Sequence, residues 1–278
     1  ALKLEVSIRM ATQVQSRLKR MVYFLEGLAP RTIALQVNLI LRDSLLSYYA
    51  RTSFRHIKYP VLEEMVLDFR THWLNRSGPH WNVCSFTLPE DAPNLRSISM
   101  IDLVPDLEST TLSGLTRLVL DAPAFDSVTW PPECFWEVLE NATALKYLEL
   151  QSWTAFEQGD TQSFPSLQYP RTIVPNLLQL VLRGFDPSDL IYILSTMDAP
   201  ELNHVVLELS GFSKQFNPGW DAVKTNHPFP SVSSLDLRLP FRNTPTSHEQ
   251  FPAFLTRLFP NVKELSIPLE GSLSVLRR

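Results

Sequence analysis

The sequence predicts an α/β solenoid, because one short apolar motif recurs along the chain and segments with helical periodicity separate its copies. The motif is a proline or small residue, an apolar residue, and then x-x-apolar-x-apolar. Such a motif places alternate side chains inward on a short strand, and each copy can bury its apolar edge only against its neighbours. The recurrence therefore predicts stacked strands rather than a compact two-layer domain.

The copies are anchored on an apolar residue whose spacing varies between 20 and 33 residues. An earlier copy covers residues 60–67, and we expect a degraded first copy at 30–35. We therefore expect an irregular leucine-rich-repeat solenoid of about eight repeats, shaped as a horseshoe with a parallel concave sheet and convex helices. The anchors are Leu62, Leu95, Leu115, Leu145, Leu177, Leu202, Val232 and Val262.

The segments between the copies carry helix signals. Asp186 and Pro187 supply an N-cap and a first-turn proline for a helix over 190–197, and prolines also begin a helix near 132. A third apolar stripe predicts a helix that starts near Glu249. Residues 11–28 form an amphipathic helix that caps or begins the stack, so we divide the chain into a cap with a degenerate repeat (1–58) and the array (59–278). Residues 151–173 and 211–229 are expected to be loops.

Many leucine-rich repeats carry an asparagine three residues after L-x-L, and this chain lacks it. Leu103, Pro123, Trp153 and Phe185 occupy those positions. We therefore expect apolar or aromatic residues to hold the turns.

The composition excludes several classes of protein. Hydrophobic residues make up 44% of the chain and charged residues 19%, which excludes a disordered chain. A net charge of −4 gives no support to nucleic-acid binding. Two cysteines, and the lack of a secretory signal or membrane-spanning stretch, favour an intracellular protein, cytoplasmic or nuclear, with no membrane partner.

No catalytic constellation stands out. Only 8 glycines occur in 278 residues, and G-x-S-x-G, Walker and G-x-G-x-x-G motifs are absent. Ser16 and Lys19 satisfy S-x-x-K without its companion motifs, and His72, His80 and Cys84 match no common zinc spacing. We predict a non-enzyme with no catalytic residue, cofactor or metal. An enzyme on a solenoid frame is the third hypothesis.

The outward side chains of the predicted strands are the candidate partner-binding residues. They carry mixed charge, and Tyr and Arg are the residue types enriched in interface hot spots. A protein or peptide ligand suits such a concave face better than a phosphate-rich one. The candidates are Arg117, Asp121, Tyr147, Glu149, Arg183, His204, Glu208, Asp236 and Arg238.

Residues 73–79, with the sequence W-L-N-R-S-G-P, lie ahead of an alternating run to Leu88 and a P-x-L-x-x-I-x-M copy. Over roughly 60–270 the chain thereby resembles the fungal F-box proteins with irregular leucine-rich repeats. The resemblance implies the substrate-binding arm of a cullin-type ubiquitin ligase receptor, whose adaptor would bind an F-box upstream of these residues. The alternative is a stand-alone repeat scaffold or inhibitor with no ubiquitin role.

Overall fold

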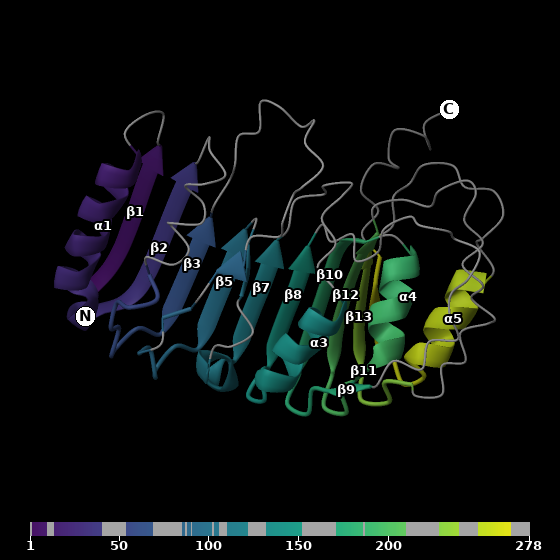
Figure 1. The fold of residues 1–278 in the computed structure, drawn as a ribbon. Coiled ribbons are helices and arrows are strands. Elements are labelled where there is room, and N and C mark those ends of the chain that lie inside the picture. The colour runs from purple at the N-terminus through teal and green to yellow at the C-terminus, as the bar shows by residue number, and fades with distance from the viewer. Residues whose placement is uncertain are drawn as a thin grey trace, which may run out of the picture. The chain divides into compact units, whose positions relative to one another are not determined.

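The computed structural model forms two compact units, unit 1 (Ala1–Lys146) and unit 2 (Tyr147–Arg278), each built on parallel strands (Figure 1). The predicted α/β class is confirmed, since helices accompany a parallel sheet in each unit. The residues described are 2–9, 14–40, 54–68, 85–86, 88–89, 91–101, 103–105, 110–121, 132–151, 171–185, 187–209, 228–238 and 250–267.

Unit 1 holds five parallel strands in the order β1-β2-β3-β5-β7. Its helical elements are α1 (Val14–Leu28), the short 3-10 helices η1 (Ala29–Arg31) and η2 (Thr110–Gly114), and α3 (Pro132–Asn141). A separate pair is formed by β4 (Ser85–Phe86) and β6 (Val104–Pro105). The strands of the sheet are β1 (Leu2–Arg9), β2 (Thr32–Ile40), β3 (Glu64–Asp68), β5 (Ser97–Ile101) and β7 (Arg117–Asp121).

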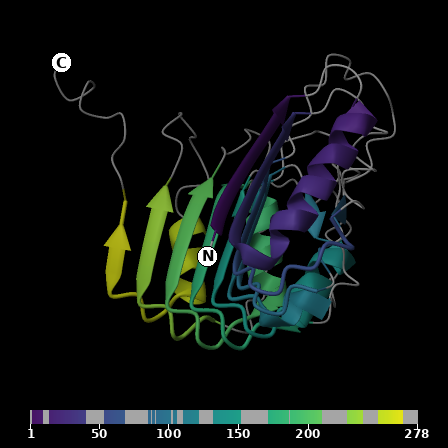
Figure 2. The same cartoon turned by 90° about the vertical axis from the view of Figure 1, so that its left-hand side faces the viewer.

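Unit 2 holds a second run of five parallel strands, β8-β10-β12-β13-β14. Two helices, α4 (Pro187–Thr196) and α5 (Gln250–Leu258), lie on one face of these strands (Figures 1 and 2). A small pair is formed by β9 (Thr172–Ile173) and β11 (Met197–Asp198). The strands of the sheet are β8 (Tyr147–Gln151), β10 (Gln179–Phe185), β12 (His204–Leu209), β13 (Ser234–Arg238) and β14 (Glu264–Ser266).

One tight turn precedes strand after strand in both units. The amide of the anchor residue donates to the carbonyl three residues earlier, as in Leu95 to Ala92 (3.1 Å), Leu145 to Ala142 (3.0 Å) and Leu202 to Ala199 (3.2 Å). Pro60, Pro93, Pro175, Pro200 and Pro230 occupy the second position of such turns. Proline suits that position because its fixed φ matches a type I or II turn. The proline of the motif is thus a turn residue.

Successive turns are joined by hydrogen bonds. The carbonyl of Asn203 accepts from the amides of Ser233 (3.0 Å) and Ser234 (3.1 Å), and Glu63 and Ser233 receive two amides of the next strand in the same way. Asn94 Nδ2 donates to the carbonyl of Pro60 (2.7 Å), and Asn261 Nδ2 donates to that of Pro230 (2.8 Å). Asparagine therefore bridges neighbouring turns at the start of the strand instead of after it.

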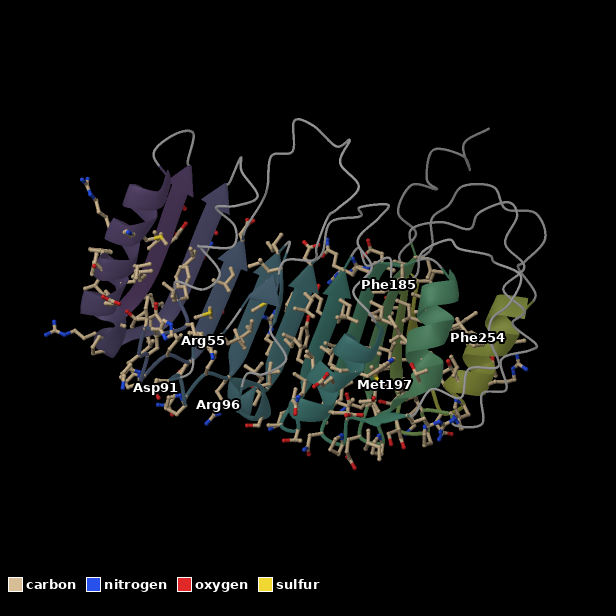
Figure 3. All side chains as sticks on the ribbon, in the orientation of Figure 1. Arg55, Asp91, Arg96, Phe185, Met197 and Phe254 are labelled. Atoms are coloured by element: carbon tan, nitrogen blue, oxygen red, sulfur yellow. The ribbon has the colours of Figure 1, made fainter. Side chains whose placement is uncertain are left out.

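The strands bury alternate side chains in two inner rows. In unit 2 the first inner row is Leu148, Leu180, Val205, Leu235 and Leu265, and the second is Leu150, Leu182, Leu207 and Leu237. All are at most 5% exposed except Leu265. Phe185, Met197 and Phe254 add to this core (Figure 3). In unit 1 the equivalent rows run from Leu4 to Leu118 and from Val6 to Leu120.

The structure adds a strand that sequence reasoning missed. Residues 1–58 were predicted as a helical cap with a degenerate first repeat. The helix is present as α1, and it connects two parallel strands, β1 and β2, of the same sheet. The cause of the miss is the sequence of β1, which alternates apolar and polar residues but lacks the proline-led turn. The chain divides into its two compact units after Lys146, and the predicted division after residue 58 stays a prediction.

The predicted helices near 132, 190 and 250 correspond to α3, α4 and α5. Leu103 and Phe185 are buried, in line with the expectation of apolar turn residues, whereas Pro123 and Trp153 lie outside the described residues. Most of the expected loops 151–173 and 211–229 also lies outside them. No helix in the described part of the chain is long and apolar enough to cross a membrane.

Tyr59 is a buried polar side chain next to one of the turns. It is fully buried, and its hydroxyl has no hydrogen-bond partner in the described structure. Burial, and to a smaller extent the charge of Glu26, raises the pKa of this phenol. A buried hydroxyl without a partner costs stability.

We expect Leu148→Ala to lower the free energy of unfolding by about 2–5 kcal/mol, because the leucine is fully buried in the first inner row. Leu178→Ala is the matched control, since Leu178 is 38% exposed in the same unit, and it should cost less than about 0.5 kcal/mol. Urea unfolding followed by circular dichroism measures both. Equal losses would contradict the inner-row assignment.

We expect Tyr59→Phe to leave the free energy of unfolding unchanged or to raise it by about 1 kcal/mol, because it removes an unpaired buried hydroxyl while keeping the ring. Thermal unfolding compared with Tyr59→Leu, which also removes the ring, checks this. A loss above about 1 kcal/mol in Tyr59→Phe would show that the hydroxyl has a stabilising partner.

Candidate functional site

The outward side chains of the unit 2 strands lie in three rows set by the strand register. Tyr147, Gln179, His204, Ser234 and Glu264 form the first row. Glu149, Val181, Val206, Asp236 and Ser266 form the second, and Gln151, Arg183, Glu208 and Arg238 form the third. Because adjacent parallel strands lie about 4.8 Å apart, charged side chains of one row can reach each other.

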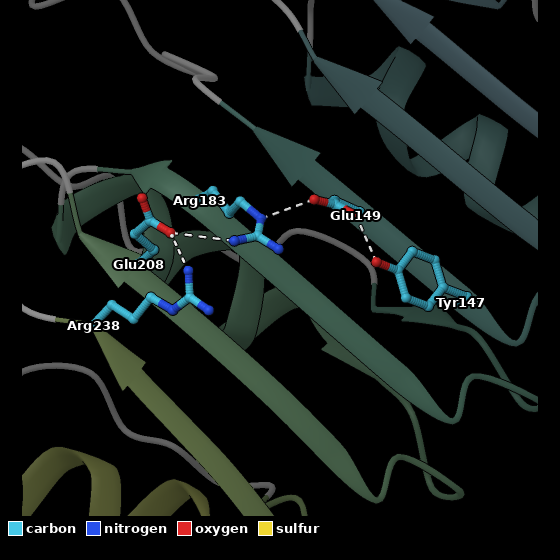
Figure 4. A network of polar contacts seen from close by, with 5 residues as sticks. All are labelled: Tyr147, Glu149, Arg183, Glu208 and Arg238. Carbon is cyan, nitrogen blue, oxygen red and sulfur yellow. Dashed lines mark hydrogen bonds and ion pairs between the residues drawn. The ribbon is translucent and has the colours of Figure 1, made fainter. Parts of the chain in front are cut away.

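Arg183 links two strands through a short ion pair. Its Nε donates to Oε1 of Glu149 on β8 (2.8 Å), and the side chains are 29% and 14% exposed. The other carboxylate oxygen of Glu149 accepts from the hydroxyl of Tyr147 (2.5 Å) (Figure 4). Both oxygens of Glu149 are therefore occupied, and the carboxylate holds Tyr147 and Arg183 in fixed positions.

The third row continues the pairing with alternating charge. Arg183 Nη1 donates to Oε2 of Glu208 on β12 (3.3 Å), and Arg238 Nη1 on β13 donates to the same oxygen (3.5 Å) (Figure 4). We call Tyr147, Glu149, Arg183, Glu208 and Arg238 the face network. It crosses four adjacent strands.

The electrostatics of the face network keep Arg183 charged. The hydrogen bond to Glu149 raises the pKa of the Arg183 guanidinium above its ordinary value, burial opposes this, and Glu208 adds to the rise. Arginine is protonated at any working pH even without this shift. The significance of the pairing is thus geometric, because it fixes the direction of the guanidinium.

His204 and Asp236 form a second, looser contact on the same face. His204 Nε2 lies 3.6 Å from Oδ2 of Asp236, which is beyond hydrogen-bond distance, and the side chains are 34% and 33% exposed. The Nε2 atom is itself buried and has no hydrogen-bond partner in the described structure. The contact is an ion pair only when the imidazole carries a charge.

Two residues between the charged rows are buried. Val181 and Val206 are on the outward side of their strands, yet they are 1% and 6% exposed. Their side chains are shorter than those of Gln179, Arg183 and Glu208 along the same strands, so the longer side chains exclude water from them. This part of the face thus has an apolar floor beneath charged groups.

A backbone irregularity follows Arg183. Gly184 has φ 72°, and the register with β12 shifts between Arg183 and Phe185. Glycine adopts this left-handed conformation without the steric cost of a side chain. Gly184 is an extra residue with no partner on β12, and it shifts the alternation by one. As a result Phe185 lies on the inner side, where it is fully buried. Arg183 can therefore stay outward while the next large side chain enters the core.

Seven of the nine predicted site residues lie on unit 2, and the structure brings five of them into the face network. His204 and Asp236 are beside it. Arg117 and Asp121 lie half-buried on β7 of unit 1, with side-chain interactions of their own. The register thus places the predicted positions on the outward side of their strands, while their role in binding stays a prediction.

Sequence reasoning missed the links between these residues. A signal was present, because the residue after the last leucine of each inner pair reads Arg183, Glu208 and Arg238 in successive strands, which alternates in charge. It also missed the burial of Val181 and Val206, although both alternate with the inner residues of their strands and so lie on the outward side. Apolar–polar alternation along a strand predicts the side on which a residue lies, but the size of the neighbouring side chains decides how much of it is exposed to solvent.

Charged groups satisfy each other, and no group of three His, Cys, Asp or Glu side chains within the described ranges could hold a metal ion. His72, His80 and Cys84 lie outside those ranges.

Comparisons of the chain with protein-family models, with curated proteins and with solved structures found no match.

We expect the Glu149–Arg183 pair to show a coupling free energy of about 1 kcal/mol, because it is short and largely shielded from water. The Glu208–Arg238 pair is the control, since it is longer (3.5 Å) and 39% and 48% exposed, and its coupling should be below about 0.5 kcal/mol. Double-mutant cycles with Glu→Gln and Arg→Met, followed by urea unfolding, give both values. A stronger coupling for the control pair would contradict this order.

Proposed function

We propose that the chain is a non-enzymatic protein-recognition module, built as an irregular leucine-rich-repeat solenoid that binds a protein or peptide on the outward face of its strands. The observation that carries the proposal is the face network. Four adjacent strands present Tyr147, two arginines and two glutamates in positions fixed by direct contacts. Preorganised side chains lose little conformational entropy on binding.

The chemistry of the face fits a polypeptide ligand. Tyrosine and arginine are enriched among residues that dominate binding energy, and Val181 and Val206 are buried beneath the charged side chains. The outward charges of unit 2 are mixed in sign, so the face offers both donors and acceptors. A polypeptide with polar and charged side chains would pair with both.

The recurring turn and the inner rows support the repeat architecture in this proposal. The same amide-to-carbonyl turn precedes strands in both units, and the anchor residue after it is buried at Leu62, Leu115, Leu177 and Val232. A leucine-rich repeat combines this kind of turn and strand. The resemblance of residues 73–79 and the following copies to fungal F-box proteins extends the proposal to the substrate-binding arm of a cullin-type ubiquitin ligase receptor.

The test is quantitative affinity purification of the natural protein that contains this chain, tagged in its own cells, followed by mass spectrometry. Wild type is compared with Tyr147→Ala/Arg183→Ala. We expect at least one co-purifying protein whose recovery falls by about tenfold or more in this variant, which corresponds to a loss of about 1.4 kcal/mol. The control Lys58→Ala/Asp91→Ala removes an exposed ion pair of unit 1 outside the strands.

The outcomes separate the parts of the proposal. Near-stoichiometric recovery of the cullin-ligase adaptor supports the ligase role, whereas a specific partner without the adaptor supports the stand-alone scaffold. Circular dichroism checks that the face variant is folded. Equal recovery of every partner from the folded face variant and the control would show that the face does not bind them.

A further inference from the structure

β1 of unit 1 and β14 of unit 2 each have one edge to which no described strand is paired. Within the described residues β1 pairs with β2 alone, and β14 pairs with β13 alone. An unpaired edge presents free amide and carbonyl groups, which can add a further strand.

The β14 edge also exposes residues that are buried in the preceding strand. Leu265 in the first inner row is 58% exposed, and Ile267 in the equivalent of the second inner row is 44% exposed. One strand earlier, Leu235 and Leu237 are 4% and 5% exposed. What covers an inner residue on one strand is the inner residue of the next, and no strand among the described residues supplies β14 with apolar residues two positions apart.

The β1 edge carries such a strand. Leu4 and Val6 pair in register with Leu35 and Val37, so they occupy the same two inner rows of their unit. They are half-buried, while Leu35 and Val37 are 1% and 0% exposed. The first strand of the chain therefore offers the alternation that the last strand leaves uncovered.

We propose that β14 of one copy of this chain pairs in parallel with β1 of a second copy. Continuing the inner rows places Leu265 beside Leu4 and Ile267 beside Val6. A parallel partner continues both ladders, in which every neighbouring pair of described strands is parallel.

This register has an independent electrostatic consequence. It sets Glu264 directly beside Lys3, and both side chains are exposed, with no ion pair or hydrogen bond to another described side chain. Opposite charges on directly opposed residues stabilise strand pairs. The inner rows alone set this register, so the opposite charges of Lys3 and Glu264 support the pairing independently.

The interface joins two different surfaces of the chain, so it is a heterologous contact and not an isologous one. β14 has only three residues. The association is consequently weak and increases with protein concentration.

Sedimentation velocity of the full chain over a concentration series tests the proposal. We expect the weight-average mass of the wild type to rise with concentration, and Leu265→Asp to remain monomeric because it places a charge at the uncovered edge. Ile173→Asp is the matched control, since Ile173 is 60% exposed on β9 away from both edges, and it should associate like the wild type. A wild type that is monomeric throughout, or a Leu265→Asp variant that associates equally well, overturns the proposal.

Charge reversal tests the register. Lys3→Glu and Glu264→Lys should each weaken the association, because each places like charges side by side. The double variant should restore it toward the wild-type level. An association that neither single variant changes, or that the double variant does not restore, overturns the pairing of β14 with β1.

Discussion

Burial of each strand's leucines by the next strand is the interaction on which the rest of the structure depends. A strand of five residues cannot shield its two inner side chains alone, so it is stable only with a neighbour in register. The turn before the strand sets that register, because a backbone carbonyl next to it accepts hydrogen bonds from two amides at the start of the neighbouring strand. The carbonyl of Asn203, for example, accepts from the amides of Ser233 and Ser234. The inner rows and the outward rows both follow from this one constraint.

The face network is a consequence of the same register. The register that pairs the inner leucines of β10, β12 and β13 also places the next residues side by side. These residues are Arg183, Glu208 and Arg238. Once three strands are aligned, opposite charges in one row pair with little further loss of side-chain freedom. Glu149 then fixes Arg183 from the other side and Tyr147 along its own strand. A stack built for burial thus produces a rigid polar surface as well, and rigidity favours recognition.

The same constraint explains why the ends differ from the middle. An inner residue on an internal strand has apolar neighbours on both sides, whereas Leu265 has them on one side only and is 58% exposed. Natural sheets protect their edges with charge or short strands, and here β14 is short and carries Glu264. Apolar side chains at such an edge are matched most closely by another strand with the same alternation.

The sequence by itself determined the α/β class, the strands that follow its eight anchors, four of the helices, and the side of the strand on which each candidate site residue lies. These follow from local spacing, since proline-led turns and alternation need no knowledge of distant residues. Only the tertiary structure decided that β1 joins the sheet, that Val181 and Val206 are buried, and that Arg183 binds Glu149 and Glu208. These depend on contacts between residues 25 or more positions apart, such as Arg183 and Glu208, which the register of neighbouring strands creates.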